Sequence, residues 1–238
     1  MKTNIHVQKL GPPGAGKSTS ASLLGRNHGY VYYEADCFFM FANPFLDPNW
    51  DNPSIKMGLQ KPLKVNCFPE SYAIKQAISN DITYKQGLSK EKIRAISTAN
   101  KIFQMISTTG KGDGLEENLK PMYDEMAIEI GKQRKRLGGD WAVAQAVFTR
   151  NQRNMLRRVL GPDLVFIVLN MTKDCQMHRI KSRHGDSMGG DLVNIMLNFF
   201  ELCEPAGEDE ENAFNVTITE DMNRDDVMEK ILEIANKS

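Results

Sequence analysis

Residues 10–19 read Leu-Gly-Pro-Pro-Gly-Ala-Gly-Lys-Ser-Thr and fit the pattern G-x-x-x-x-G-K-[ST] at every fixed position. Because glycine has no Cβ, such a backbone can curl until its N–H groups surround a phosphate. The side chain of Lys17 can then reach the β- and γ-phosphates, and the Ser18 hydroxyl can bind Mg²⁺. The predicted phosphate-contacting residues are Gly11, Pro12, Pro13, Gly14, Ala15, Gly16, Lys17, Ser18 and Thr19.

The residues on either side of this segment agree with a nucleotide site. Residues 4–10 have the pattern of a strand, with Ile5 and Val7 on one side. A helix is expected to begin near Lys17 and to end near Gly25, so the positive end of its dipole faces the phosphates. Strand, glycine-rich loop and helix together predict binding of ATP or GTP with Mg²⁺.

The composition limits the class of protein. The chain has 238 residues, enough for one α/β domain with an insertion, and its 30 basic and 30 acidic residues balance. This balance does not support a general nucleic-acid binder, and the basic run at 132–136 is expected to be a solvated helix face. No apolar run is long enough to span a membrane. Four separated cysteines without a C-x-x-C pair indicate reduced thiols, so we expect a cytoplasmic protein.

Strand and helix patterns alternate along most of the chain. Further strands are expected at 29–36, 141–147, 164–169 and 213–218, and helices at 149–160, 172–184, 192–202 and 225–235. This order predicts an α/β fold with three layers, in which a five-stranded parallel sheet has helices on both faces. We expect a nucleotide-binding core at 1–41 and 138–238, with a lid near 183–192. Residues 42–137 are expected to form a loop-rich and then helical insertion on the acceptor side.

Two carboxylates follow the second expected strand. Glu34 and Asp36 point the same way, because strand residues two apart share a face. Asp36 can accept a proton from a substrate hydroxyl or hold Mg²⁺ through water, and Glu34 is a candidate substrate-binding residue. A helix cap or a surface salt bridge is the alternative role. Gln145 occupies the end of the third strand, where many P-loop ATPases carry an acid, and this favours a small-molecule kinase over a motor or transporter.

Arginines supply the remaining candidates. Arg179 and Arg183 are four residues apart on one helix face, before a loop that contains glycine. An arginine at such a place can move over the transferring phosphate and exclude water, and a guanidinium can also stack on an adenine ring. Arg153, in the helix after the third strand, can bind an anionic group of the substrate. A solvated basic helix face is the alternative in each case.

Several stretches of the chain together resemble the gluconokinase-like branch of the P-loop small-molecule kinases, whose wider relatives include shikimate and adenylate kinases. The phosphate loop is one stretch, and residues 34–36 are similar to the family's acid-x-Asp. Residues 52–63 look like its N-I-x-K-M-x-x-G-x-P-L segment, residues 179–185 like its R-L-x-x-R-x-G-H, and residues 192–205 like its Q-F-x-x-L-E-x-P. The resemblance covers roughly residues 4–65 and 140–235.

The resemblance implies ATP-dependent phosphorylation of a small-molecule hydroxyl. Asp36 would be the base, Lys17 the phosphate clamp and Ser18 the Mg²⁺ ligand, while Arg179 would lie against adenine and Arg183 would close from the lid. The acceptor half departs from the family, because residues 64–69 read Lys-Val-Asn-Cys-Phe-Pro where gluconokinases usually carry an acidic run, an arginine and a tryptophan. Gluconate is therefore not assigned as the substrate.

Two other functions stay open at this point. A nucleoside monophosphate kinase could use the helical insertion as its acceptor domain. A nucleotide-dependent binding or switch protein could have lost its acceptor, although Asp36 and the lid arginines argue against this. ATP is favoured over GTP by the resemblance, and the chain has no guanine-reading N-K-x-D motif. The acceptor and the oligomeric state do not follow from the sequence.

Overall fold

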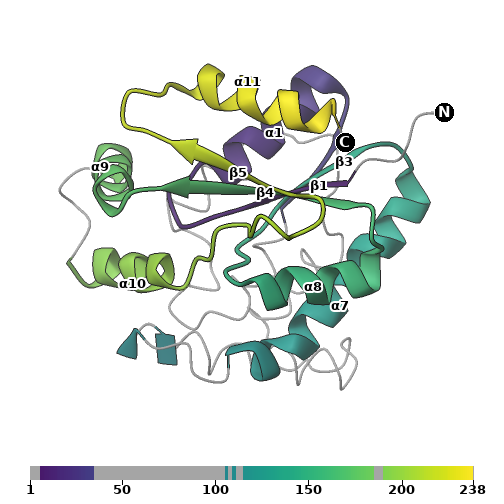
Figure 1. Ribbon diagram of the computed structural model, residues 1–238, viewed down its shortest axis with the longest axis horizontal. Helices are drawn as coiled ribbons and strands as arrows, with labels where there is room; N and C mark the ends of the chain where they lie inside the picture. Colours follow the sequence, from purple (N-terminus) through teal and green to yellow (C-terminus); the bar gives the residue numbers. More distant parts are fainter. Residues whose placement is uncertain (1–5, 35–104, 107–108, 111–114, 185–189, 238) are drawn as a thin grey trace, which may run out of the picture.

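The computed structural model describes residues 6–34, 105–106, 109–110, 115–184 and 190–237 (Figure 1). Asp36, most of the expected insertion and half of the expected lid lie outside these residues. Among the described helices, none is both long enough and apolar enough to cross a membrane.

The described strands form one parallel sheet. They are β1 (His6–Leu10), β2 (Val31–Glu34), β3 (Trp141–Ala144), β4 (Leu164–Met171) and β5 (Ala213–Ile218), and their spatial order is β2-β3-β1-β4-β5. The central strand β1 pairs with β3 and β4, and His6 lies opposite both Trp141 and Leu164. All carboxyl ends therefore meet at one edge, where ligands bind in open α/β sheets.

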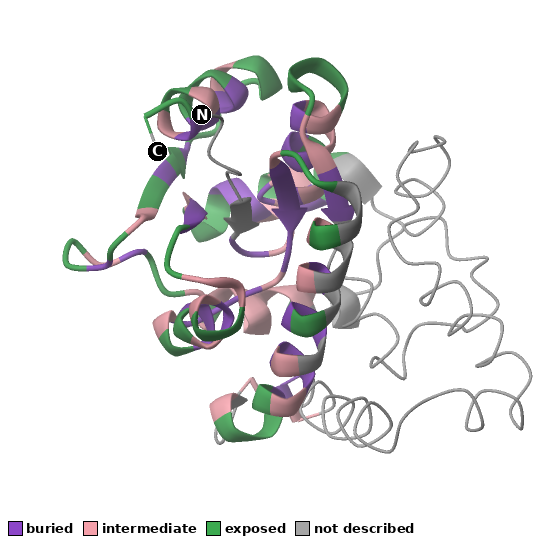
Figure 2. Cartoon of the chain, turned by 90° about the vertical axis from the view of Figure 1, so that its right-hand side faces the viewer, coloured by how far each residue is buried: buried purple, intermediate pink, exposed green. Residues whose placement is uncertain are grey.

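Helices cover both faces of the sheet. On one face lie α1 (Lys17–His28) and α11 (Arg224–Ala235), and on the other lie α7 (Leu115–Leu137) and α8 (Arg150–Leu160) (Figure 1). Successive side chains of β4 point to opposite faces of the sheet, so this one strand packs against both helix layers. Leu164, Phe166 and Val168 are buried with α7 and α8, whereas Val165 and Ile167 are buried with α1 and α11. Figure 2 shows buried strands of the sheet between the partly exposed helices, whereas β5 at its edge is partly exposed.

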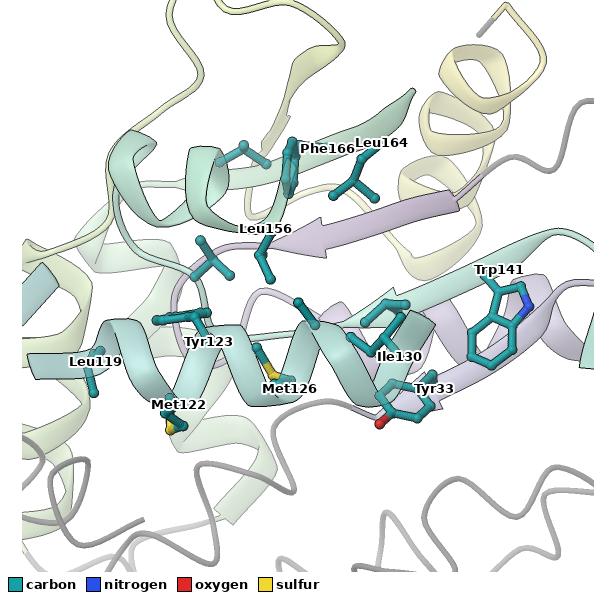
Figure 3. Packing of buried hydrophobic residues seen from close by; sticks show 14 of the residues in the cluster. Tyr33, Leu119, Met122, Tyr123, Met126, Ile130, Trp141, Leu156, Leu164 and Phe166 are labelled. Atoms are coloured by element: carbon teal, nitrogen blue, oxygen red, sulfur yellow. The ribbon is translucent and has the colours of Figure 1, made fainter. Parts of the chain in front are cut away.

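Helix α7 packs in the core, although residues 42–137 were expected to form the insertion. Its buried residues recur at helical spacing and contribute to one of the two apolar clusters (Figure 3). Because this apolar stripe packs in the layer of α8 and against the sheet, α7 contributes to the core layer on that face. The stripe consists of Leu119, Met122, Tyr123, Met126, Ala127 and Ile130.

Two further helices follow β4, namely α9 (Lys173–His184) and α10 (Gly190–Glu201). Because α9 begins two residues after β4 ends, its first turn lies at the carboxyl edge of the sheet. Strand β3 ends at Ala144, three residues before the predicted end at 147. The reason is local: the backbone N–H groups of Phe148 and Thr149 donate to Oε1 of Gln152 in α8, so the chain there turns into the helix cap.

Candidate functional site

A tight loop connects β1 to α1 at the carboxyl edge of the sheet. Gly11, Gly14 and Gly16 have φ values of 139°, 85° and 86°, which residues with a Cβ rarely adopt. A Cβ on Gly11 would also lie 2.5 Å from the carbonyl oxygen of Leu169 in β4. The loop closes with a hydrogen bond from the N–H of Ala15 to the oxygen of Pro12. The backbone therefore has the curled form that the sequence motif predicts.

Lys17 begins α1 and lies inside the loop. Its side chain is buried, and Nζ donates to the carbonyl oxygens of Gly11 at 2.9 Å and Pro12 at 3.1 Å. Ser18 is partly exposed and Thr19 is exposed, so both occupy the first turn of α1 within reach of solvent. The structure thus places a cation, a hydroxyl and a helix N-terminus in one small volume, which is the chemistry that a nucleotide phosphate requires.

A hollow of about 370 Å³ lies beside the loop, and its size falls in the usual range of ligand pockets, about 300–1,000 Å³. Residues of the loop, of α1 and of α9 to α11 line it, including Gly16, Thr19, Met196 and Val227. Arg179 on α9 lines the hollow too, and its Nη2 donates to the carbonyl oxygen of Met222 at 3.0 Å. The structure therefore brings Arg179 together with the phosphate loop.

For two other predicted residues, Glu34 and Arg183, the structure places the backbone alone. Glu34 is the last residue of β2 and pairs in register with Ala144, so its backbone lies at the carboxyl edge. Arg183 follows Arg179 by one turn of α9. Asp36 lies outside the described residues, so its predicted role as base and metal ligand rests on the sequence.

Arg153 has a different place from the one expected. It is fully buried in α8, and its Nε and Nη2 each donate to the Glu210 carboxylate at 2.7 Å. Nη1 and Nη2 also donate to the carbonyl oxygens of Glu204 and Pro205. The guanidinium is enclosed by these partners and has no surface for an anionic substrate, so the structure corrects the expected substrate-binding role to one of anchoring the segment before β5.

Arg150 and Arg157 of α8 also bind the segment before β5. Arg150 forms a bidentate ion pair with Asp209, and Arg157 donates to Glu210 at 3.1 Å while its guanidinium lies 4.6 Å from the centre of the Phe166 ring. Burial would raise the pKa of Glu210, but the hydrogen bonds and charges of Arg153 and Arg157 outweigh it and hold this pKa below its ordinary value. The basic helix is thus paired with an acidic loop rather than left solvated.

Cys203 lies in the same segment and is partly buried. Burial raises the pKa of its thiol to about 12, and the positive charges of Lys17 and Arg153 oppose this rise without cancelling it. The sulfur is therefore a neutral thiol at physiological pH.

Sequence reasoning missed one residue of the site. Gln176 on α9 is fully buried, and its Nε2 donates to the carbonyl oxygen of Pro13 at 2.9 Å. One turn later, Ile180 packs so near to Gly14 that a Cβ there would lie 3.3 Å from Cγ1 of Ile180. Nothing in the sequence separates Gln176 from an ordinary surface glutamine, because the contact spans 163 residues.

Solved structures of other proteins have a fold similar to that of this chain, among them a gluconokinase and a sugar kinase. A gluconokinase from Sinorhizobium meliloti 1021 has a TM-score of 0.54 at 14% identity and is covered over 94% of its length by the whole of this chain. An unliganded sugar kinase from Janibacter sp. has a TM-score of 0.52 at 18% identity, with 98% of this chain and 95% of that one covered. The chain matches no protein-family model, and no curated protein matches it significantly. The two structures share its fold.

Proposed function

We propose that this protein is a kinase that transfers the γ-phosphate of ATP, with Mg²⁺, to a hydroxyl group of a small molecule. The observation that carries the proposal is the curled loop of residues 11–16 with Lys17 inside it, at the carboxyl edge of a parallel sheet. The fold that the chain shares with a sugar kinase and a gluconokinase agrees with this class of reaction.

The described residues fit the nucleotide. The three glycines at positive φ leave space for phosphate oxygens beside backbone N–H groups, and a hollow of about 370 Å³ continues from the loop past Arg179. We place the β- and γ-phosphates in the loop and the base in the hollow, against Arg179. Lys17 would release the carbonyl oxygens of Gly11 and Pro12 and bind the phosphates in their place.

The residues also fit a magnesium ion that arrives with the nucleotide. Mg²⁺ prefers oxygen ligands and in kinases usually has one or two protein ligands besides phosphate oxygens and waters. The partly exposed hydroxyl of Ser18 is such a ligand, and Asp36 is the carboxylate that the sequence offers. Bound there, the ion would neutralise charge on the transferring phosphate.

In the proposed reaction the acceptor hydroxyl oxygen forms a bond to the γ-phosphorus as the bond to the β,γ-bridging oxygen breaks. Asp36 takes the proton of the hydroxyl, and ADP leaves. Lys17 stabilises the charge that builds on the phosphate oxygens, and Arg183 of α9 closes over them and excludes water.

The test is ADP release from ATP·Mg²⁺ with a panel of acceptors, in which sugar acids and polyols stand beside nucleoside monophosphates. We expect stimulation by a polyol or sugar acid and its loss in Asp36→Asn, which should still bind ATP. Stimulation by a monophosphate instead would overturn the hydroxyl acceptor in favour of a nucleotide kinase. Tight ATP binding without stimulation by any acceptor would favour a binding or switch protein.

A further inference from the structure

We infer that Gln176 is a positioning residue, which holds the phosphate loop in its binding-ready shape and ties it to α9, the helix that carries Arg179. This inference rests on the proposed nucleotide site and adds a residue to it. The side chain is fully buried, and its amide nitrogen donates to the carbonyl oxygen of Pro13 at 2.9 Å.

The orientation of the amide is determined by its partner. A carbonyl oxygen only accepts hydrogen bonds, so the Nε2 side of Gln176, and not the Oε1 side, must face Pro13. Oε1 is buried and has no hydrogen-bond partner among the described residues. Burying an unpaired amide oxygen costs free energy. The hydrogen bond to Pro13 offsets part of this cost and stabilises the buried position of the side chain.

The bond to Pro13 also orients the next backbone donor of the loop. In a trans peptide the C=O and the N–H point in opposite directions, and the described chain has no cis peptide bond. When the Pro13 oxygen is held toward α9, the N–H of Gly14 is held away from α9. The Gly14 N–H then does not have to reorient when a phosphate enters the loop, which lowers the entropic cost of binding.

The same helix contacts the loop one turn further on, and it carries the arginine of the hollow. Ile180, four residues after Gln176, lies against Gly14, while Arg179 lines the hollow beside the loop. Gln176 and Ile180 therefore fix the distance between the loop and Arg179. A shift of α9 relative to the loop would move the proposed phosphate and base sites apart.

The experiment measures binding of ATP·Mg²⁺ to the full chain by isothermal titration calorimetry, for wild type and Gln176→Met. Methionine keeps the length and volume of the side chain but donates no hydrogen bond. We expect Kd to rise about tenfold, the equivalent of one hydrogen bond of about 1.4 kcal/mol. Gln176→Glu should weaken binding further, since its carboxylate cannot donate and repels the phosphates.

Gln152→Met is the matched control. Gln152 is also fully buried, but its amide oxygen accepts from Phe148 and Thr149 at the start of α8. We expect it to lower the thermal midpoint while leaving Kd for ATP within about twofold of wild type. A general loss of stability would therefore not imitate the effect at Gln176.

The outcomes separate this inference from the proposed function. Wild-type affinity in a folded Gln176→Met variant would overturn the positioning role and leave the nucleotide site standing. Absence of ATP binding by the wild type would overturn the nucleotide site itself. Equal weakening in Gln152→Met and Gln176→Met would also overturn the positioning role, because the effect would then follow from stability.

Discussion

Nζ of Lys17 donates a 2.9 Å hydrogen bond to the carbonyl oxygen of Gly11, so the ammonium lies inside the curl of the loop. A second bond reaches Pro12 at 3.1 Å. The ammonium therefore occupies the concave side of the loop, where a nucleotide phosphate would compete with the two carbonyl groups for it. Both the binding and the chemistry that we propose depend on this side chain.

Replacing Lys17 tests this dependence. Lys17→Ala should abolish phosphoryl transfer, with a loss of at least about 10³-fold, because no cation would then stabilise the transferring phosphate. The loss of the two hydrogen bonds should lower stability by about 1–3 kcal/mol, and the chain should stay folded. Steady-state ADP release and thermal unfolding measure the two effects. Lys230→Ala, at an exposed lysine of α11, is the control, and transfer retained in Lys17→Ala would refute the assignment.

Two glycine-to-alanine substitutions should change the stability of the fold differently. Gly11→Ala should destabilise the fold by at least about 1–3 kcal/mol, because φ is 139° and the new Cβ would lie 2.5 Å from a backbone oxygen. Gly131→Ala, in the interior of α7, should be neutral or stabilise by up to about 1 kcal/mol, since its Cβ would meet only Leu160 at 4.0 Å. Chemical denaturation measures both changes, and equal effects at the two sites would contradict the loop geometry.

The buried pair of Arg153 and Glu210 predicts a dependence of stability on pH. The pKa of Glu210 is lower in the folded chain than in the unfolded one, so the pair stabilises the fold above the ordinary pKa of glutamate and loses this effect as the pH falls through the folded value. Glu210→Gln should cost about 3–5 kcal/mol at pH 7, because Arg153 would remain as a buried charge. The difference from wild type should shrink below about pH 4.5.

Urea denaturation of the wild type and of Glu210→Gln from pH 7 to pH 3 measures this dependence. Asp209→Asn is the control, since Asp209 is 76% exposed in its pair with Arg150 and should matter by only about 0–1 kcal/mol. A constant difference between wild type and Glu210→Gln over the whole pH range would show that the carboxylate charge does not stabilise the fold.

Arg179 tests the position of the base. Arg179→Ala should raise KM for ATP about tenfold with a smaller change in kcat, because a guanidinium stacked on the base binds the ground state and the transition state alike. Arg179→Lys should recover little, since an ammonium has no flat face to stack. Initial rates at varied ATP give both constants. Arg158→Ala, at an exposed arginine of α8, is the control, and an unchanged KM in Arg179→Ala would move the base elsewhere.

The parts of the site that lie close together in the sequence were predictable. The loop of residues 11–16, the start of α1 at Lys17 and the parallel strands follow from local patterns, because glycine placement, helix caps and continuous apolar runs act over a few residues. The predicted place of Arg179 beside the nucleotide came from the family resemblance, and the structure has Arg179 lining the hollow beside the loop.

Contacts between distant segments were not predictable. Arg153 has the sequence pattern of a cleft arginine, and its burial depends on Glu210, 57 residues further on. Residues 115–137 were expected in a helical insertion because the region has no strand pattern, and the sequence alone does not show which surface the apolar stripe of α7 covers. Gln176 carries no sequence signal at all, since its partner is a backbone carbonyl 163 residues away. In each case the deciding partner is set by tertiary packing.

The central claim is transfer of the γ-phosphate to a hydroxyl, and ³¹P NMR of the wild-type protein with ATP, Mg²⁺ and the stimulating acceptor tests it most directly. The account predicts that a phosphate monoester of the acceptor forms at the rate at which ADP appears, and that none forms with Lys17→Ala. Inorganic phosphate as the only product, or a new phosphoanhydride in place of a monoester, would contradict it.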